Sequence, residues 1–145
     1  MQIFQINFKM RTLLVLLLSI LILTACIDRL KVLREDLQNT VIEYNDLLRW
    51  GEFNKAKLYT DTSIREEFEA SAKNAKNVKI VDYRILSTDF EVEKGEQIVE
   101  VEFDYYTSLT NVVKTVLDKQ KWSFVYVKEE KKKRWRLMTP LPEFK

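Results

Sequence analysis

Apolar residues recur along the chain at two different periods, and the change of period separates an expected helical part from an expected strand part. Between Asp28 and Gly51 the spacing is three or four residues, which is typical of one apolar stripe along a helix. Asp28 is suited to cap the start of this helix, and Gly51 to end it in a left-handed conformation. The stripe comprises Leu30, Leu33, Leu37, Val41, Tyr44 and Leu48.

Two shorter helices are expected next. The sequence Ser63-Ile64-Arg65-Glu66 matches a capping box, in which serine and glutamate bond to each other's backbone N–H groups, and it predicts the start of the second of them. Phe68 and Ala72 are expected to face the core, and this helix is expected to fade between Asn74 and Asn77. The apolar positions of the other helix are Phe53, Ala56, Leu58 and Tyr59.

After Asn77 apolar and polar residues alternate, which is typical of strands with one buried face. Short turns separate the expected strands, so neighbours along the chain are expected to pair. Helices followed by an antiparallel meander predict an α+β fold, with the N-terminal helices packed on a curved four-stranded sheet. The expected strands are residues 78–92 with a bulge near Leu86, 99–105, 112–127 with an interruption near Lys119, and 134–138.

The start of the chain has the composition of a secretory signal peptide. The basic residues Lys9 and Arg11 precede an uncharged apolar run from Thr12 to Leu23. This run is shorter than the roughly 20 apolar residues that span a bilayer, which favours cleavage over the alternative, a retained membrane helix. Translation from either Met1 or Met10 leaves a valid signal.

Leu23-Thr24-Ala25-Cys26 closes the apolar run and resembles a bacterial lipobox, the motif that a lipoprotein signal peptidase recognises. The resemblance implies that residues 1–25 are removed, that residues 26–145 form a single α+β domain, and that the sulfur of Cys26 carries a diacylglycerol. Two or more acyl chains anchor a protein stably to a membrane. Because Ile27 replaces the aspartate of an inner-membrane retention signal, we expect the periplasmic face of the outer membrane, with the inner membrane as the alternative.

Several reactive residue types are rare or missing, which narrows the classes of function. The chain has no histidine, one cysteine and two glycines, which excludes histidine-dependent hydrolases, histidine-based zinc sites and glycine-rich phosphate loops. Of its 24 basic residues two lie in the leader, so 22 remain against 22 acidic residues. This balance argues against nucleic acid as a partner. No cofactor and no metal are expected.

The order of the expected elements resembles a known fold, and the amino-acid sequence of several stretches resembles known proteins. Three helical segments before a bent meander resemble the nuclear-transport-factor-2-like fold, a cone-shaped α+β domain. The stretches Tyr44–Phe53, Val116–Trp122, Arg134–Leu137 and Pro140–Pro142 resemble a group of small, uncharacterised proteobacterial lipoproteins. This resemblance implies a fold and an anchor, and it brings no activity.

Aromatic side chains are candidates for a ligand pocket inside such a cone, although rings of this size also dominate the cores of small domains. In some cone-shaped folds a carboxylate beside the pocket transfers protons, which requires burial to raise its pKa. The available carboxylates are Asp82, Asp104 and Asp118. The pocket candidates are Trp50, Tyr59, Tyr83, Tyr105 and Trp122.

Glu100, Glu102 and Asp104 form an acidic row on one expected strand. Alternate residues of a strand lie about 7 Å apart, which is too wide for three ligands on one ion. We therefore expect a solvated face with cross-strand partners such as Lys114 or Lys121, rather than a metal site.

A basic run, Lys131–Arg134 together with Arg136, adjoins Glu129 and Glu130. Such runs bind anionic lipid headgroups or polyanions in some proteins. Charged hairpin turns are the commoner setting, so we expect a turn here.

Three hypotheses for the function follow. The first is a lipid-anchored interaction or scaffold domain with a protein partner in the envelope, and not an enzyme. The second is a small-ligand or glycan binder that uses the cone pocket, and the third is a pocket enzyme of the ketosteroid-isomerase type. A filled interior with exposed apolar side chains favours the first, an aromatic platform facing solvent the second, and a deep cavity with a buried carboxylate the third.

Overall fold

The computed structural model describes residues 29–91 and 95–145, and only the backbone of residues 87–91. The expected signal peptide, the lipobox with Cys26 and the helix cap at Asp28 lie outside these residues. The chain divides into two compact units, residues 1–36 and 37–145. Residues 29–36 of the first unit are helical, and all other described elements belong to the second unit.

Three helical stretches open the second unit. The first is helical to residue 49 and ends at Gly51, whose φ of 72° is the left-handed conformation predicted for it. Next come α2 (Phe53–Ala56) and its continuation, the 3-10 turn η1 (Lys57–Tyr59). The last stretch is η2 (Thr62–Ile64), α3 (Arg65–Asn74) and η3 (Ala75–Asn77), so the helix fades where the sequence predicted.

The predicted capping box at residues 63–66 is wrong, because the cap lies two residues earlier. The side chain of Asp61 accepts a hydrogen bond from the backbone N–H of Ser63 at 2.9 Å, whereas α3 itself has no side-chain cap. The Ser63 hydroxyl also donates to Asp61, at 2.7 Å. The ionised carboxylate accepts both bonds, which holds the pKa of Asp61 below its usual value.

Four antiparallel strands follow in the order β1-β2-β3-β4, which confirms the predicted meander. Pairing of β3 with β2 runs without a shift through Lys119, so the expected interruption there is wrong; Lys119 faces solvent and pairs with Glu100 instead. β1 has the predicted bulge at Leu86 and a second one at Val81. The strands are β1 (Val78–Glu91), β2 (Glu96–Thr107), β3 (Lys114–Val127) and β4 (Lys132–Leu137).

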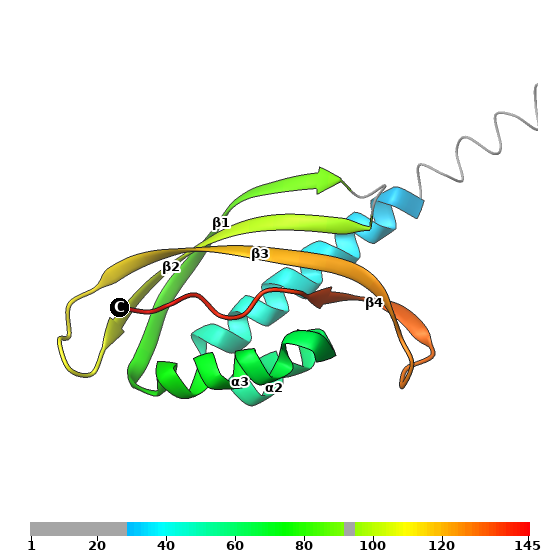
Figure 1. Cartoon of the computed structure of the whole chain (residues 1–145). Helices are drawn as coiled ribbons and strands as arrows, with labels where there is room; N and C mark the ends of the chain where they lie inside the picture. Colours follow the sequence, from blue (N-terminus) through cyan, green and yellow to red (C-terminus); the bar gives the residue numbers. More distant parts are fainter. Residues whose placement is uncertain (1–28, 92–94) are drawn as a thin grey trace, which may run out of the picture. The chain divides into compact units, whose positions relative to one another are not determined.

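The core lies between the concave face of the curled sheet and the helices (Figure 1). Alternation along β2 buries Val99, Val101, Phe103 and Tyr105, as predicted. The stripe of the first helix is buried in the second unit, whereas Leu30 in the first unit is exposed. Phe68 of α3 is buried and Ala72 packs against the same core. The buried stripe consists of Leu37, Val41, Tyr44 and Leu48.

Candidate functional site

The five aromatic candidates lie in three different settings. Trp122 and Tyr105 are buried, Tyr59 and Tyr83 are half-buried, and Trp50 is 75% exposed. The structure brings Tyr59 and Trp122 together through Tyr44, whose ring centroid lies 6.3 Å and 5.4 Å from theirs. Trp50 lies apart on the surface, with the guanidinium carbon of Arg49 6.0 Å from its ring centroid.

The two remaining tyrosines use their hydroxyl groups in structural hydrogen bonds. Tyr83 donates to a carboxylate oxygen of Asp46 at 2.9 Å, and burial together with this bond raises the pKa of Tyr83 to about 12. Tyr105 donates to the backbone carbonyl of Lys145 at 2.6 Å. The raised pKa of Tyr83 makes its hydroxyl a poor proton donor near neutral pH.

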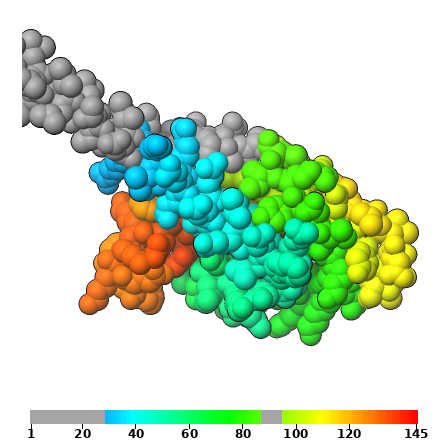
Figure 2. All heavy atoms as spheres, turned by 180° about the vertical axis from the view of Figure 1, so that it is seen from behind, coloured from blue at the N-terminus to red at the C-terminus, as the bar shows by residue number. Residues whose placement is uncertain are grey.

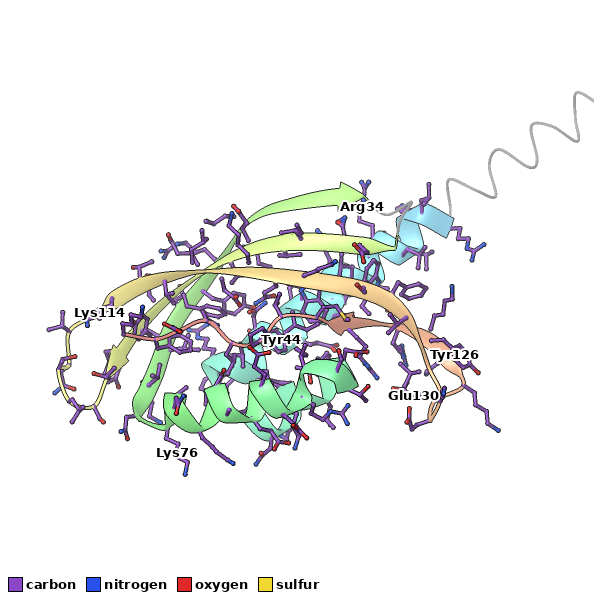
Figure 3. All side chains as sticks on the ribbon, in the orientation of Figure 1. Arg34, Tyr44, Lys76, Lys114, Tyr126 and Glu130 are labelled. Carbon is purple, nitrogen blue, oxygen red and sulfur yellow. The ribbon has the colours of Figure 1, made fainter. Side chains whose placement is uncertain are left out.

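A group of buried polar side chains lies between the first helix and β3, and we call it the inner polar cluster. Asp118, Gln120 and Trp122 alternate along β3, so all three point to the inner face of the sheet. Tyr44 and Asn45 come from the helix, and Figure 3 shows Tyr44 between the helix and the sheet. The cluster is thus formed by residues 75 positions apart in sequence, Asn45 and Gln120.

Gln120 is the centre of the hydrogen bonds in this cluster. Its amide nitrogen donates to Asn45 Oδ1 at 2.8 Å and to Asp118 Oδ2 at 3.0 Å. Its carbonyl oxygen accepts from the indole N–H of Trp122 at 3.3 Å and from Asn45 at 3.4 Å. The Tyr44 hydroxyl is buried and makes no hydrogen bond within the described part of the chain.

Burial changes the acid–base properties of the cluster. Asp118 is 5% exposed, and desolvation raises its pKa to about 6, with the hydrogen bond from Gln120 acting in the opposite direction. Desolvation also raises the pKa of Tyr44 well above its usual value, and the charge of Asp118 adds to that rise. Of the three carboxylates considered, only Asp118 is buried. Asp104 bonds to Arg84, and Asp82 pairs with Arg49 at the surface.

A carboxyl with a pKa near neutrality is chemically able to take up or release a proton. Access is a separate requirement, and the side chains of the inner polar cluster are almost fully buried. Asn45, Gln120 and Tyr44 were not among the site residues expected from the sequence. The signal in the sequence was the presence of two polar residues, Asp118 and Gln120, at alternate positions of β3 that face inwards.

Hollows lie elsewhere on the described part of the chain. One of about 510 Å³ lies between α2 with η1 and α3, and another of about 230 Å³ lies between α3 and residues 141–145. Neither is lined by a residue of the inner polar cluster. The first has an apolar wall and several charges, with Lys57 paired to Glu69 at 2.7 Å and Lys55 paired to Glu52. Its wall is Phe53, Phe68 and Ala72, and its lysines are Lys55, Lys57, Lys73 and Lys76.

The acidic row lies on the outer face of the sheet and is ion-paired. Arg84 of β1 donates to Asp104 at 2.8 Å and to Glu102 at 3.1 Å, and Lys119 of β3 lies 3.0 Å from Glu100. The hydrogen bond from Arg84 lowers the pKa of Asp104. The expected partners were wrong: Lys121 pairs with Glu96, and Lys114 donates to a backbone carbonyl. No metal-binding group of three ligands occurs among the described residues.

The basic run begins in the turn between β3 and β4, at Lys131, and continues along β4 from Lys132. Arg136 and Arg134 lie 2.8 Å and 3.1 Å from Glu130, and Lys132 lies 3.7 Å from it. The hydrogen bond from Arg134 is the largest cause of the lowered pKa of Glu130. These contacts fit the expected charged turn, in which one carboxylate balances part of the positive charge.

The turn between β2 and β3, residues 108–113, carries apolar side chains into solvent, and we call it the apolar turn. Leu109 is 86% exposed, Val113 60% and Val112 58%. The turn is ordered by hydrogen bonds from the N–H groups of Thr110 and Asn111 to the carbonyl of Thr107. In Figure 2 the yellow atoms of this region lie at one end of the second unit.

No family model, no curated protein and no solved structure matches this chain. Within residues 29–91 and 95–145, no helix has the length and apolar character needed to cross a bilayer. The function is therefore argued from the side chains themselves.

Proposed function

We propose that this chain is a lipid-anchored lipoprotein of the bacterial cell envelope, which faces the periplasm and binds a protein partner as an interaction or scaffold domain. The lipobox ending at Cys26 supports the anchor. The order of three helices and a curled meander supports the finer assignment to the nuclear-transport-factor-2-like fold. The stretches at residues 44–53, 116–122, 134–137 and 140–142 support the resemblance to small proteobacterial lipoproteins. Ile27 favours the outer membrane over the inner membrane as the site of anchoring.

The burial of large side chains between the sheet and the helices is the observation that favours binding over catalysis. Tyr44, Trp122 and Trp135 are almost completely buried between the sheet and the helices, where a pocket enzyme needs an open cavity. By contrast, Trp50 is exposed beside Arg49, and tryptophan and arginine are the residue types enriched where proteins contribute most to binding a partner.

The anchor is tested by metabolic labelling with a fatty-acid analogue. Cys26→Ser is expected to abolish labelling and to leave an unprocessed or soluble chain, because the acylated sulfur is lost. Ser19→Ala, a small change in the same leader, is the matched control and retains labelling. Equal labelling of Cys26→Ser and the parent chain refutes the anchor.

The partner is tested by affinity purification of the acylated chain from solubilised membranes, followed by mass spectrometry. Trp50→Ala is expected to lose the enriched partner, because the exposed ring and its arginine neighbour are the proposed contact. Tyr126→Ala removes another exposed aromatic ring and is the matched control. If both variants retain the same partner, Trp50 is not its binding site.

Small-ligand binding is a second candidate, which the hollow of about 510 Å³ favours. Its apolar wall and its lysines, of which Lys55 and Lys57 are ion-paired with Glu52 and Glu69, suit an anion with an apolar tail, such as dodecanoate. Titration calorimetry with dodecanoate is expected to show weaker binding to Lys73→Glu than to Lys128→Glu, which alters an exposed lysine elsewhere. Equal affinities for both variants exclude this hollow as the site.

A pocket enzyme remains the third candidate, with Asp118 as the proton-transferring group and the Tyr44 hydroxyl as a hydrogen-bond donor. The raised pKa of Asp118 favours it, and the burial of both residues opposes it. A steroid or phenol analogue that binds the parent chain but not Asp118→Asn would support this activity.

A further inference from the structure

We propose that the apolar turn inserts into the surface of an anionic lipid bilayer, so that the folded domain contacts a membrane independently of any acyl chain. Three branched apolar side chains at the tip of one hairpin are unusual for a water-facing turn. Their placement on an ordered turn means that they are held outwards, since the N–H of Asn111 bonds at 3.0 Å to the carbonyl of Thr107. Burial in the acyl boundary removes Leu109, Val112 and Val113 from water.

Lysines surround the apolar turn, and their charge determines which kind of surface the turn can bind. Lys114 begins β3 directly after the turn, and Lys79 of β1 pairs in register with Tyr106 of β2. Lys76 precedes Asn77, whose carbonyl accepts a hydrogen bond at 3.0 Å from the N–H of Ser108. Figure 3 shows Lys114 and Lys76 at the same end of the second unit. An apolar tip within a collar of exposed lysines is complementary to anionic headgroups above a hydrocarbon layer.

Acidic groups near this end are ion-paired, and the one carboxylate in excess, where Arg84 serves both Asp104 and Glu102, is outnumbered by the three lysines. Asp104 of β2 bonds to Arg84 and accepts a hydrogen bond from Thr115 at 2.8 Å. Glu143 lies 3.1 Å from Lys145. The local field at the turn is therefore positive, which attracts a phosphatidylglycerol-rich surface and disfavours a basic partner.

Tyr106 adds a further feature of a membrane-facing edge. It is half-exposed, it directly precedes Thr107 at the end of β2, and it lies opposite Lys79. Tyrosine rings are enriched at the depth of the headgroups, where the ring contacts acyl chains and the hydroxyl meets water. From the tip towards the domain, apolar side chains are followed by an aromatic ring and then by lysines. Acyl chains, the interface and charged headgroups have the same order in one leaflet of a bilayer.

The test places an environment-sensitive label on the tip itself. The full chain carries Cys26→Ser and Leu109→Cys, and a nitrobenzoxadiazole group is attached to the new thiol. Vesicles contain phosphatidylcholine alone or with about one third phosphatidylglycerol. With the anionic vesicles we expect a blue shift of the emission and quenching by nitroxide-labelled lipid, and with the neutral vesicles a much weaker change.

A matched chain separates tip insertion from attachment by other parts. Cys26→Ser with Ile98→Cys places the label at a position that is 51% exposed on the outer face of β2, away from the turn. Binding through the leader segment alone changes both labels equally or neither, so only a response confined to position 109 supports the proposal. Because acylation is absent from both chains, failure of the proposed lipid anchor does not affect the outcome.

The collar is tested by Lys76→Gln, Lys79→Gln and Lys114→Gln together in the chain labelled at position 109. Each lysine near an anionic surface contributes about five-fold to the partition coefficient, so the three changes are expected to weaken the response about a hundred-fold. An unchanged response of this variant, no response at position 109, or a response only to an added envelope protein overturns the proposal.

Discussion

The inner and outer faces of the sheet hold carboxylates in opposite states. On the inner face Asp118 is buried beside two amides and an indole, and its pKa is raised to about 6. On the outer face Asp104 bonds to Arg84 and Thr115, and its pKa is lowered. Both residues lie on neighbouring strands of one sheet, so strand parity alone decides which environment each receives.

This difference shows where the fold is sensitive to change. The outer ion pairs are exposed to water, which screens them and allows each partner to be solvated when the other is lost. The inner groups have no such alternative, because an unsatisfied buried polar atom loses its water without gaining a partner. Substitutions on the inner face should therefore have larger effects than comparable substitutions on the outer face.

The largest effect is expected from Trp122→Ala. The ring is fully buried and packs edge-on against Tyr44, so its removal leaves a cavity and is expected to lower the free energy of unfolding by about 3–5 kcal/mol. Urea denaturation followed by circular dichroism measures this change. Trp50→Ala, at an exposed ring, is the control and should change it by less than about 0.5 kcal/mol. A loss below about 1 kcal/mol for Trp122→Ala contradicts the burial of the ring.

Asp118→Asn is expected to stabilise the protein at alkaline pH. Because folding raises the pKa of Asp118 from 3.8 to about 6, its contribution to stability is complete below pH 3.8 and is lost as the pH rises through 6. The amide cannot ionise and keeps an oxygen for the Gln120 N–H, so at pH 8 the variant should be more stable by up to about 3 kcal/mol.

The measurement is the difference in unfolding free energy between parent and Asp118→Asn across pH 4 to 8. The difference is expected to grow in favour of the variant through pH 6. Carboxylates with lowered pKa, such as Asp104, are present in both chains and cancel. A difference that does not vary with pH shows that Asp118 does not titrate in this range.

A smaller loss is expected from Gln120→Met, which keeps the volume and removes the amide. Asn45 Oδ1 and Asp118 Oδ2 then lose a donor in the interior, at a cost of about 1–3 kcal/mol in unfolding free energy. Thermal and urea denaturation should agree on this loss. The double variant with Asp118→Leu should recover part of it, since the buried carboxyl is then absent, and failure to recover any of it excludes this pairing as the cause.

The smallest effect is expected from Arg84→Gln on the outer face. It removes the partner of Glu102 and Asp104, yet all three side chains contact water, so Tm should fall by less than about 4 °C. The difference from the parent should shrink further in high salt, because salt screens exposed charges. A larger decrease that is insensitive to salt indicates that Arg84 acts through packing instead.

Much of the fold could be predicted from the sequence because its elements have regular periods. The stripe at Leu37, Val41 and Tyr44 and the alternation of β2 both identify buried faces, and Gly51 marks a helix end. The local errors arose where two residue types compete for one role. Asp61 displaced Ser63 as the cap, and Lys119 continued a strand because its long side chain reaches water and Glu100.

The candidate site was much harder to predict than the fold. Asp118 was one of three candidate carboxylates, and only the packing of β3 against the first helix shows that it is the buried one. Asn45 and Gln120 are brought together across 75 residues, which no local pattern reports. The apolar turn has no helical or strand periodicity that would mark it in the sequence. Its proposed function depends on where the surrounding lysines lie, which only the three-dimensional structure shows.

The edges of the sheet have a consequence for the behaviour of many copies together. Unpaired backbone groups along a straight outer strand recruit strands from other molecules and begin fibres. Here one outer strand, β1, is bent by shifts at Ile80/Asp82 and Ile85/Ser87, and the other, β4, carries Lys132, Lys133, Arg134 and Arg136 and is met at its end by Thr60. If the proposed lipid anchor holds the protein on one leaflet of a membrane, copies of it collide often, and these edges oppose strand pairing between them.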